Sequence, residues 1–173
     1  IFYDLFPEGP PINTKEKFLQ ADEAGRVVEI WNNVFMAYNR SEDGSLTELE
    51  KKNIDTGMGF ERTLAVLNGE KSGYETDLFA DTIKTIETQT GKKYSENQKE
   101  FRIICDHVRS SVFLLGDENK TLPGNTDQGY ILRRFIRKAV RLLAFLGATK
   151  QSLGEVAKTT INTYVTMYPE LEA

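Results

Sequence analysis

The chain has 173 residues, of which 39% are hydrophobic and 28% charged; this balance excludes a disordered protein and supplies enough apolar material for one good core or two small ones. No apolar run approaches the roughly 20 residues that span a bilayer, and the start of the chain does not resemble a signal peptide, so we expect a cytoplasmic setting and no membrane partner. One cysteine and one histidine cannot build a Cys/His zinc site, so zinc is not expected.

The first predicted elements are a β-hairpin and a helix. Residues 26–40, RVVEIWNNVFMAYNR, are rich in β-branched and aromatic side chains, which favours a strand, and the Asp-Gly of SEDGS indicates a tight turn. The return strand is expected within residues 46–55, LTELEKKNID. After it, Ala, Leu and Val recur at helical spacing in ERTLAVLNG, with Gly69 as the predicted stop.

From about residue 74 onward the pattern is helical. Amphipathic stretches separated by glycines predict four helices, within residues 75–91, 96–116, 128–147 and 151–168. The sequence therefore predicts an α+β fold in which antiparallel strands come first and an all-helical region follows.

The segment NIDTGMGFERTLAVLNG, residues 53–69, places two glycines, an acid and an arginine where a strand gives way to a helix. Glycine lets the backbone approach a ligand, and a helix N-terminus favours an anion such as phosphate. A dinucleotide fingerprint would need a third glycine in place of Arg62, and a P-loop would need a Gly-Lys-Ser/Thr ending that is absent. The remaining pattern, G-x-G-x-x-R, resembles motif 3 of the class II aminoacyl-tRNA synthetases, and NIDTGMGFER is similar to its form in the alanyl-tRNA synthetase family.

Other strings match the same family in the same order and cover most of residues 1–147: IFYD, EIWNNVFMAYNR, YETDLF, DHVRSSVFLL and LPGNTDQGYILRRFIRKAVR. The resemblance implies that residues 1–70 form the C-terminal portion of the catalytic domain, with motif 3 and part of the class II antiparallel sheet. It implies that residues 71–173 begin the helical domain that recognises the tRNA acceptor stem. Motifs 1 and 2 and the editing and oligomerisation domains are expected outside this segment, so we expect an internal fragment that is inactive alone.

The activity that the resemblance implies is an ATP-dependent ligase that activates alanine and transfers it to the 3′ end of alanine tRNA, with ATP and Mg²⁺ as a substrate complex. Gly59 and Arg62 match ATP-binding residues, and Arg62, the expected catalytic residue, would direct its guanidinium at phosphate. A surface arginine paired with a nearby acid is the alternative interpretation of Arg62. Glu29 is a candidate Mg²⁺ ligand, although magnesium is often held mostly by water and phosphate, and no protein-built metal site is predicted.

Four residues match the alanine-binding positions of the family. By similarity, Asp55 binds the ammonium of alanine and Gly57 lets the backbone close over a substrate whose side chain is a methyl group; a helix N-cap is the alternative interpretation of Asp55. Asn32 and Val34 have the period-two spacing that puts both on one face of a strand, where the family has an amide that holds alanine and an apolar wall. For Val34, an ordinary core position is the alternative.

Residues 133–141, RRFIRKAVR, hold five basic residues and no acid, although the whole chain has a net charge of −4. Their spacing forms one broad helical face opposite an apolar stripe, which favours phosphate binding over a merely solvated face. In the family the corresponding helix approaches the acceptor stem, and Asn125 in LPGN matches the asparagine at the G·U wobble pair of alanine tRNA. The expected tRNA-binding set is therefore Asn125, Arg133, Arg134, Arg137, Lys138 and Arg141.

Three features depart from the family pattern near this loop. The family commonly has Ser in place of Gly124 and Arg in place of Gln128, and the segment LLGDENKTLPGN is about two residues longer than usual. A non-catalytic RNA-binding module derived from a class II synthetase is the alternative function. Such a module would keep the basic helix and lose the alanine pocket, so the intact residues Asp55, Gly57, Gly59 and Arg62 count against it.

Overall fold

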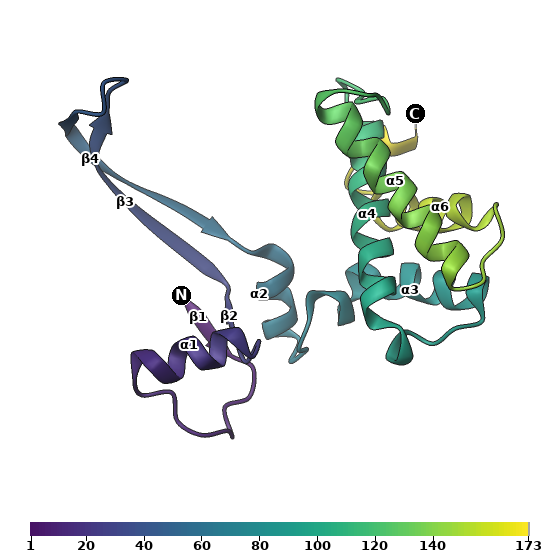
Figure 1. The fold of residues 1–173 in the computed structure, drawn as a ribbon, viewed down its shortest axis with the longest axis horizontal. Coiled ribbons are helices and arrows are strands. Elements are labelled where there is room, and N and C mark those ends of the chain that lie inside the picture. Colours follow the sequence, from purple (N-terminus) through teal and green to yellow (C-terminus); the bar gives the residue numbers. More distant parts are fainter. Residues whose placement is uncertain (173) are drawn as a thin grey trace. The chain divides into compact units, whose positions relative to one another are not determined.

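The computed structural model describes residues 1–172 and divides into two compact units, Ile1–Thr76 and a second that begins at Asp77 (Figure 1). The first unit contains two small antiparallel sheets and two α-helices, and the second contains helices alone within its described residues. This order of strands followed by helices confirms the α+β fold that the sequence predicts. The functional assignment of residues 1–70 and 71–173 to two domains stays a prediction.

The first sheet pairs strand β1 (Phe2–Asp4) with strand β2 (Val27–Glu29), and helix α1 (Lys15–Glu23) lies between them in the chain. Arg26 holds this part together, because its Nε and Nη2 donate to the two carboxylate oxygens of Asp4 at 2.9 and 2.6 Å and its Nη1 donates to the carbonyl of Pro10 at 2.7 Å. The hydrogen bond from Arg26 lowers the pKa of Asp4 below its usual value. The Asp4–Arg26 ion pair therefore connects the end of β1 to the residue that directly precedes β2.

The second sheet is a long hairpin formed by β3 (Trp31–Arg40) and β4 (Leu46–Met58) (Figure 1). The sequence predicts one strand over residues 26–40, but the structure interrupts it at Ile30. There the backbone changes partner: the N–H of Ile30 donates to the carbonyl of Ile1 at 3.0 Å, and its carbonyl accepts from the N–H of Gly59 at 2.9 Å. The return strand also runs past residue 55, so that it ends directly before the glycine-arginine junction.

Helix α2 (Phe60–Leu67) follows Gly59 directly and buries Ala65. Gly69, with φ +73°, ends the helix as predicted, because the N–H groups of Gly69 and Glu70 donate back to Val66 and Ala65 at 3.1 and 2.8 Å. A short 3₁₀ helix, Gly73–Glu75, completes the first unit. The predicted order of strand, junction and helix is therefore confirmed.

The second unit contains the four predicted helices, with ends that differ from the expected ones by a few residues: α3 (Asp77–Thr90), α4 (Gln98–Gly116), α5 (Asp127–Phe145) and α6 (Ser152–Tyr164). Short 3₁₀ helices span Tyr94–Glu96 and Pro169–Glu172. Helix α4 packs against both α5 and α6, and α3 packs against α6. The core between them includes the fully buried side chains Phe101, Ile104, Leu132, Leu146 and Val156.

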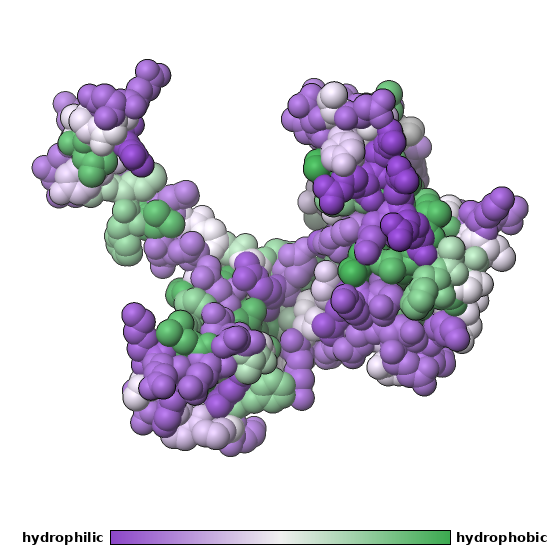
Figure 2. Space-filling view, viewed as in Figure 1, coloured by the Kyte–Doolittle hydropathy of each residue, from purple (hydrophilic) through white to green (hydrophobic). Residues whose placement is uncertain are grey.

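Burial differs greatly between the units. Among the described residues of the first unit, the only buried hydrophobic side chains are those of Ala21, Val27 and Ala65. Figure 2 shows apolar side chains on the surface of the hairpin, where Val34, Phe35, Met36, Tyr38, Leu46, Ile54 and Met58 are exposed. None of the helices in the described part of the chain combines the length and apolar character that crossing a membrane requires.

Candidate functional site

The hairpin register brings together the four residues that the sequence predicts to bind alanine. Asn32 lies opposite Gly57, and Val34 lies opposite Asp55, two residues further along the ladder. Residues that face each other in an antiparallel ladder point to the same side of the sheet, as do residues two apart on one strand. Asn32, Val34, Asp55 and Gly57 therefore occupy one face at the base of the hairpin, which we call the amide–acid face.

The opposite face of the same ladder carries hydrogen bonds that hold this register. The indole Nε1 of Trp31 donates to Oγ1 of Thr56, which donates to the side-chain carbonyl of Asn33 at 2.8 Å. A slip by one residue would break these bonds and turn every side chain to the other face. Trp31, Asn33 and Thr56 thus fix which residues reach the amide–acid face, and Trp31 points away from it, as the period-two spacing predicts.

The amide–acid face is open and its acid has no cation partner. Asp55 and Val34 are exposed, Val34 by 47%, and Asp55 forms no ion pair with any described residue. Asp55 lies inside β4, and the residue that caps α2 is Gly59, so the N-cap interpretation of Asp55 is wrong. Within the described chain, Val34 is likewise not a core residue. Both side chains are available to a ligand.

Arg62 lies on the first turn of α2 and folds back over Gly59. A Cβ atom added to Gly59 would lie 2.6 Å from Nε and 3.0 Å from Cζ of Arg62, so only glycine lets the guanidinium cross the backbone this closely. Arg62 is exposed and forms no ion pair within residues 1–172, in contrast to the alternative of a paired surface arginine. Its side chain is exposed at the strand-to-helix junction.

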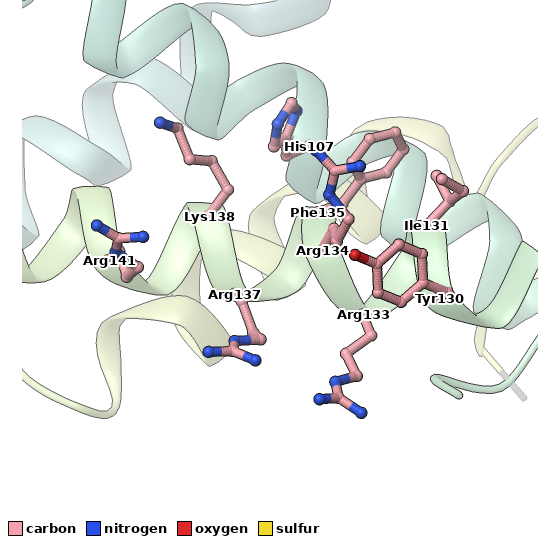
Figure 3. Close-up of a pocket in the computed structure, with 9 residues that line it drawn as sticks. All are labelled: His107, Tyr130, Ile131, Arg133, Arg134, Phe135, Arg137, Lys138 and Arg141. Carbon is pink, nitrogen blue, oxygen red and sulfur yellow. The ribbon is translucent and has the colours of Figure 1, made fainter. Parts of the chain in front are cut away.

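Helix α5 carries the second group of candidate residues, on a groove of about 500 Å³ that is open to solvent (Figure 3). Four of its five cations are exposed, Arg133 is half-buried, and none forms an ion pair with a described acid. Helix α5 buries its other side through Leu132, Ala139 and Leu143. This basic groove is lined by His107, Tyr130, Ile131, Arg133, Arg134, Phe135, Arg137, Lys138 and Arg141.

Three aromatic rings of the basic groove were not among the predicted residues. The guanidinium of Arg134 lies 5.7 Å from the ring centre of Tyr130, and the His107 ring lies 4.6 Å from that of Phe135 at a tilt of 32°. Tyr130 precedes Arg134 by one helical turn, a spacing that could have revealed the pair. His107 comes from α4, and no pattern in the sequence joins it to α5.

The loop before α5 is folded tightly against the first turn of that helix. The N–H of Gly124 donates to the carbonyl of Gly129 at 2.9 Å, and a Cβ added to Gly129 would lie 2.7 Å from the carbonyl oxygen of Leu122. A Cβ added to Gly124 would meet Gly129 only at 3.7 Å, an ordinary contact, so a small side chain fits there. Asn125 is exposed on this loop, and its side-chain carbonyl accepts a hydrogen bond from Nη1 of Arg133.

The described residues do not form a metal cage. No three His, Cys, Asp or Glu side chains gather within residues 1–172, and Glu29 stands half-exposed on β2 without such partners. Cys105 lies in the core of the second unit, where burial raises the pKa of its thiol to about 12, and His107 instead hydrogen-bonds Asp106 at 3.1 Å.

An open amide–acid face, an arginine folded over a glycine junction and a basic groove are thus present on an α+β chain. The chain belongs to the family described as tRNA synthetases class II (A), whose family model matches residues 1–173.

Curated proteins similar to this chain include several alanine–tRNA ligases. The chain is 48% identical over 151 residues to that of Treponema denticola, an alignment that covers 86% of this chain and 25% of the relative. It is 39% identical over 176 residues to that of Halalkalibacterium halodurans, covering 99% of this chain and 20% of the relative. The chain therefore spans only a fifth to a quarter of the length of these relatives.

Proposed function

We propose that this chain is the segment of an alanine–tRNA ligase that binds alanine on the amide–acid face, ATP phosphate at Arg62 and the tRNA acceptor stem in the basic groove. The observation that carries the proposal is the hairpin register, which pairs Asn32 with Gly57 and Val34 with Asp55. The relatives named alanine–tRNA ligase support the same activity. The activity belongs to the full-length protein, of which this chain is one part.

Alanine is a small zwitterion with a methyl side chain, and the amide–acid face suits each of its parts. The unpaired carboxylate of Asp55 accepts charge-assisted hydrogen bonds from the ammonium group. The amide of Asn32 holds a polar group of the amino acid, and the exposed Val34 limits the space for its side chain. Apart from the adjoining residues of the chain, no atom lies within 4 Å of a Cβ added to Gly57, so the backbone at this position is open to a substrate.

The first reaction joins the alanine carboxylate to the α-phosphorus of ATP, and pyrophosphate leaves. ATP enters as its magnesium complex, so the metal is part of the substrate. Arg62 has no acid partner within the described residues, so its fork of donors is available to phosphate oxygens, where it stabilises the negative charge that spreads during displacement. The alanyl group then passes from AMP to a ribose hydroxyl at the 3′ end of the tRNA.

The basic groove supplies the RNA contacts of this segment. Its exposed cations, Arg134, Arg137, Lys138 and Arg141, neutralise backbone phosphates and so add affinity without reading sequence. Asn125, on the exposed loop beside them, has both a donor and an acceptor and suits a base edge in the shallow minor groove of an RNA helix. Affinity and base-pair selection therefore reside on neighbouring parts of one surface.

The amino-acid site is tested by Asp55→Asn in the full-length protein. We expect alanine binding to weaken by about 1.5 to 3 kcal/mol, because a charged hydrogen bond is lost, whereas ATP binding changes little. The measurement is alanine-dependent pyrophosphate exchange with each substrate varied in turn. The control is Glu48→Gln, which removes an acid from the same strand beyond the amide–acid face.

Two outcomes contradict this assignment. Equal losses for alanine and ATP would remove Asp55 from the alanine site. If the unaltered full-length protein binds alanine tRNA but supports no exchange, it is instead the non-catalytic RNA-binding module considered from the sequence.

A further inference from the structure

Arg133 differs from the other four cations of the basic groove. It is half-buried, whereas Arg134, Arg137, Lys138 and Arg141 are exposed. Within the described residues it is also the one cation of this group with a side-chain hydrogen bond, which its Nη1 donates to Oδ1 of Asn125. In Figure 3 the side chains of Arg133 and Arg137 extend from the same side of α5, so Arg137 offers a matched comparison one turn further along.

The hydrogen bond determines how the amide of Asn125 is presented. An asparagine side chain has one acceptor oxygen and one donor nitrogen of nearly equal size, so packing alone does not choose between its two flipped orientations. A guanidinium only donates, and it therefore bonds to the oxygen and never to the amide nitrogen. The contact with Arg133 thus places Oδ1 on the side of α5 and leaves both N–H donors of Nδ2 for a ligand.

The backbone on either side makes this contact a fixed one. The hydrogen bond between Gly124 and Gly129 closes the loop onto the first turn of α5, and the missing Cβ of Gly129 permits the close approach of the Leu122 carbonyl. Asn125 follows Gly124 directly, and Arg133 lies one helical turn beyond Gly129 on the same helix. The loop and the helix therefore hold the two side chains in register.

We propose that Arg133 is a positioning residue for base-pair selection, which orients the amide of Asn125 instead of serving mainly as a phosphate contact. The inference rests on the proposed binding of the acceptor stem by this surface. Its consequence is that loss of Arg133 reduces discrimination between a wobble pair and a Watson–Crick pair in the acceptor stem nearly as much as loss of Asn125 does. Loss of a cation that contacts only phosphate lowers binding of both RNAs alike.

The test measures kcat/KM of the full-length protein for alanine tRNA and for its variant with a Watson–Crick pair at the wobble position. The variants are Asn125→Ala, Arg133→Ala, the double variant and Arg137→Ala as the matched control. We expect Asn125→Ala to reduce the ratio of the two values by roughly 5- to 150-fold, the range for one base-edge contact. Arg133→Ala should reduce this ratio nearly as far. The double variant should reduce the ratio no further than Asn125→Ala alone, because the two side chains act together.

Two further measurements separate orientation from charge. Arg137→Ala should keep the ratio while the logarithmic dependence of tRNA affinity on salt becomes shallower by about one. Arg133→Gln removes the charge but keeps an N–H donor that can reach Oδ1 of Asn125, so it should retain more of the ratio than Arg133→Ala. Equal loss of the ratio in Arg133→Gln and Arg133→Ala would show that the charge, and not the hydrogen bond, supports discrimination, and would overturn the inference.

The failure of the inference and the failure of the proposed function give different results. If Asn125→Ala removes discrimination and Arg133→Ala retains it, only the positioning role is wrong. If neither variant changes the ratio, Asn125 does not read the base pair, and the inference falls together with that part of the proposed function. Circular dichroism of each purified variant checks that the protein is folded, and Arg133→Gln gives a second test of the same position.

Discussion

The hairpin unit and the helical unit support their candidate functional side chains in different ways. The amide–acid face lies on a two-stranded ladder with no buried side chain among its residues, and its geometry depends on backbone register and on the bonds of Trp31 and Thr56. The basic groove lies on a helix whose other side is part of a packed core. The positions of the candidate side chains thus depend on strand register in the first unit and on helix packing in the second.

The largest expected effect tests this difference in burial. Phe101 is fully buried in the helical unit, and Phe35 on the hairpin is 76% exposed. Phe101→Ala should lower the free energy of unfolding of the 173-residue chain by about 3 to 5 kcal/mol, because it removes a large buried ring and leaves a cavity. Phe35→Ala should change it by less than about 0.5 kcal/mol. Urea unfolding followed by helical circular dichroism measures both, and similar losses would contradict the comparison.

The next prediction separates the chemistry of the two units in the full-length protein. Arg62→Ala should lower alanine-dependent pyrophosphate exchange by about 10²- to 10³-fold, because in the proposed site one donor to developing phosphate charge is lost. Binding of alanine tRNA should stay unchanged. Arg137→Ala should do the reverse and weaken tRNA binding while exchange continues at its normal rate. A loss of both activities in either variant would show that the two sites are not separate.

A smaller effect is expected where backbone segments pack closely before α5. Gly129→Ala should destabilise the helical unit by about 1 to 3 kcal/mol, because the new methyl group would lie 2.7 Å from the carbonyl oxygen of Leu122. Alanine otherwise favours a helix, so a stabilised variant would refute the clash. The matched control is Gly124→Ser, for which the structure leaves ordinary contact distance. Thermal unfolding of both variants measures the difference.

The smallest effect concerns the ion pair of the first unit. Because the hydrogen bond from Arg26 lowers the pKa of Asp4, the folded pKa lies below the unfolded value, and the pair contributes stability above pH of about 4. That contribution is lost as the pH falls through the lowered pKa. Amide exchange in β2 should therefore be slower in the unaltered chain than in Asp4→Asn at pH 6, with the difference vanishing at low pH. A difference that is independent of pH would contradict this role.

The sequence predicts the helices well and the hairpin only in outline. Apolar periodicity locates all four helices of the second unit, and Gly69 correctly marks the end of α2. The break at Ile30 was not predicted, because residues 26–40 read as one β-rich run and the change of hydrogen-bond partner depends on residues distant in sequence. The composition of a strand does not record which neighbour its backbone will meet.

The candidate site shows the same limit. Period-two spacing correctly puts Asn32 and Val34 on one face, but only the register of the hairpin brings Asp55 and Gly57 to that face. Asn125 and Arg133 were both predicted to bind RNA, yet their mutual hydrogen bond requires the loop closure between Gly124 and Gly129. Spacing along one element can be read from sequence, whereas contacts across a turn depend on how that turn closes.

The hairpin contains a change of register that separates its base from its tip. Pairs up to Met36 and Asn53 follow one register, and pairing resumes at Tyr38 and Glu48. Between these two pairs, four residues of β4 face a single residue of β3. This irregularity absorbs a difference in strand length before it reaches the amide–acid face. Insertions and deletions in the tip, beyond Tyr38 and Glu48, should therefore be tolerated during evolution, and the same tip offers a place to attach a fluorophore without disturbing the residues at the base.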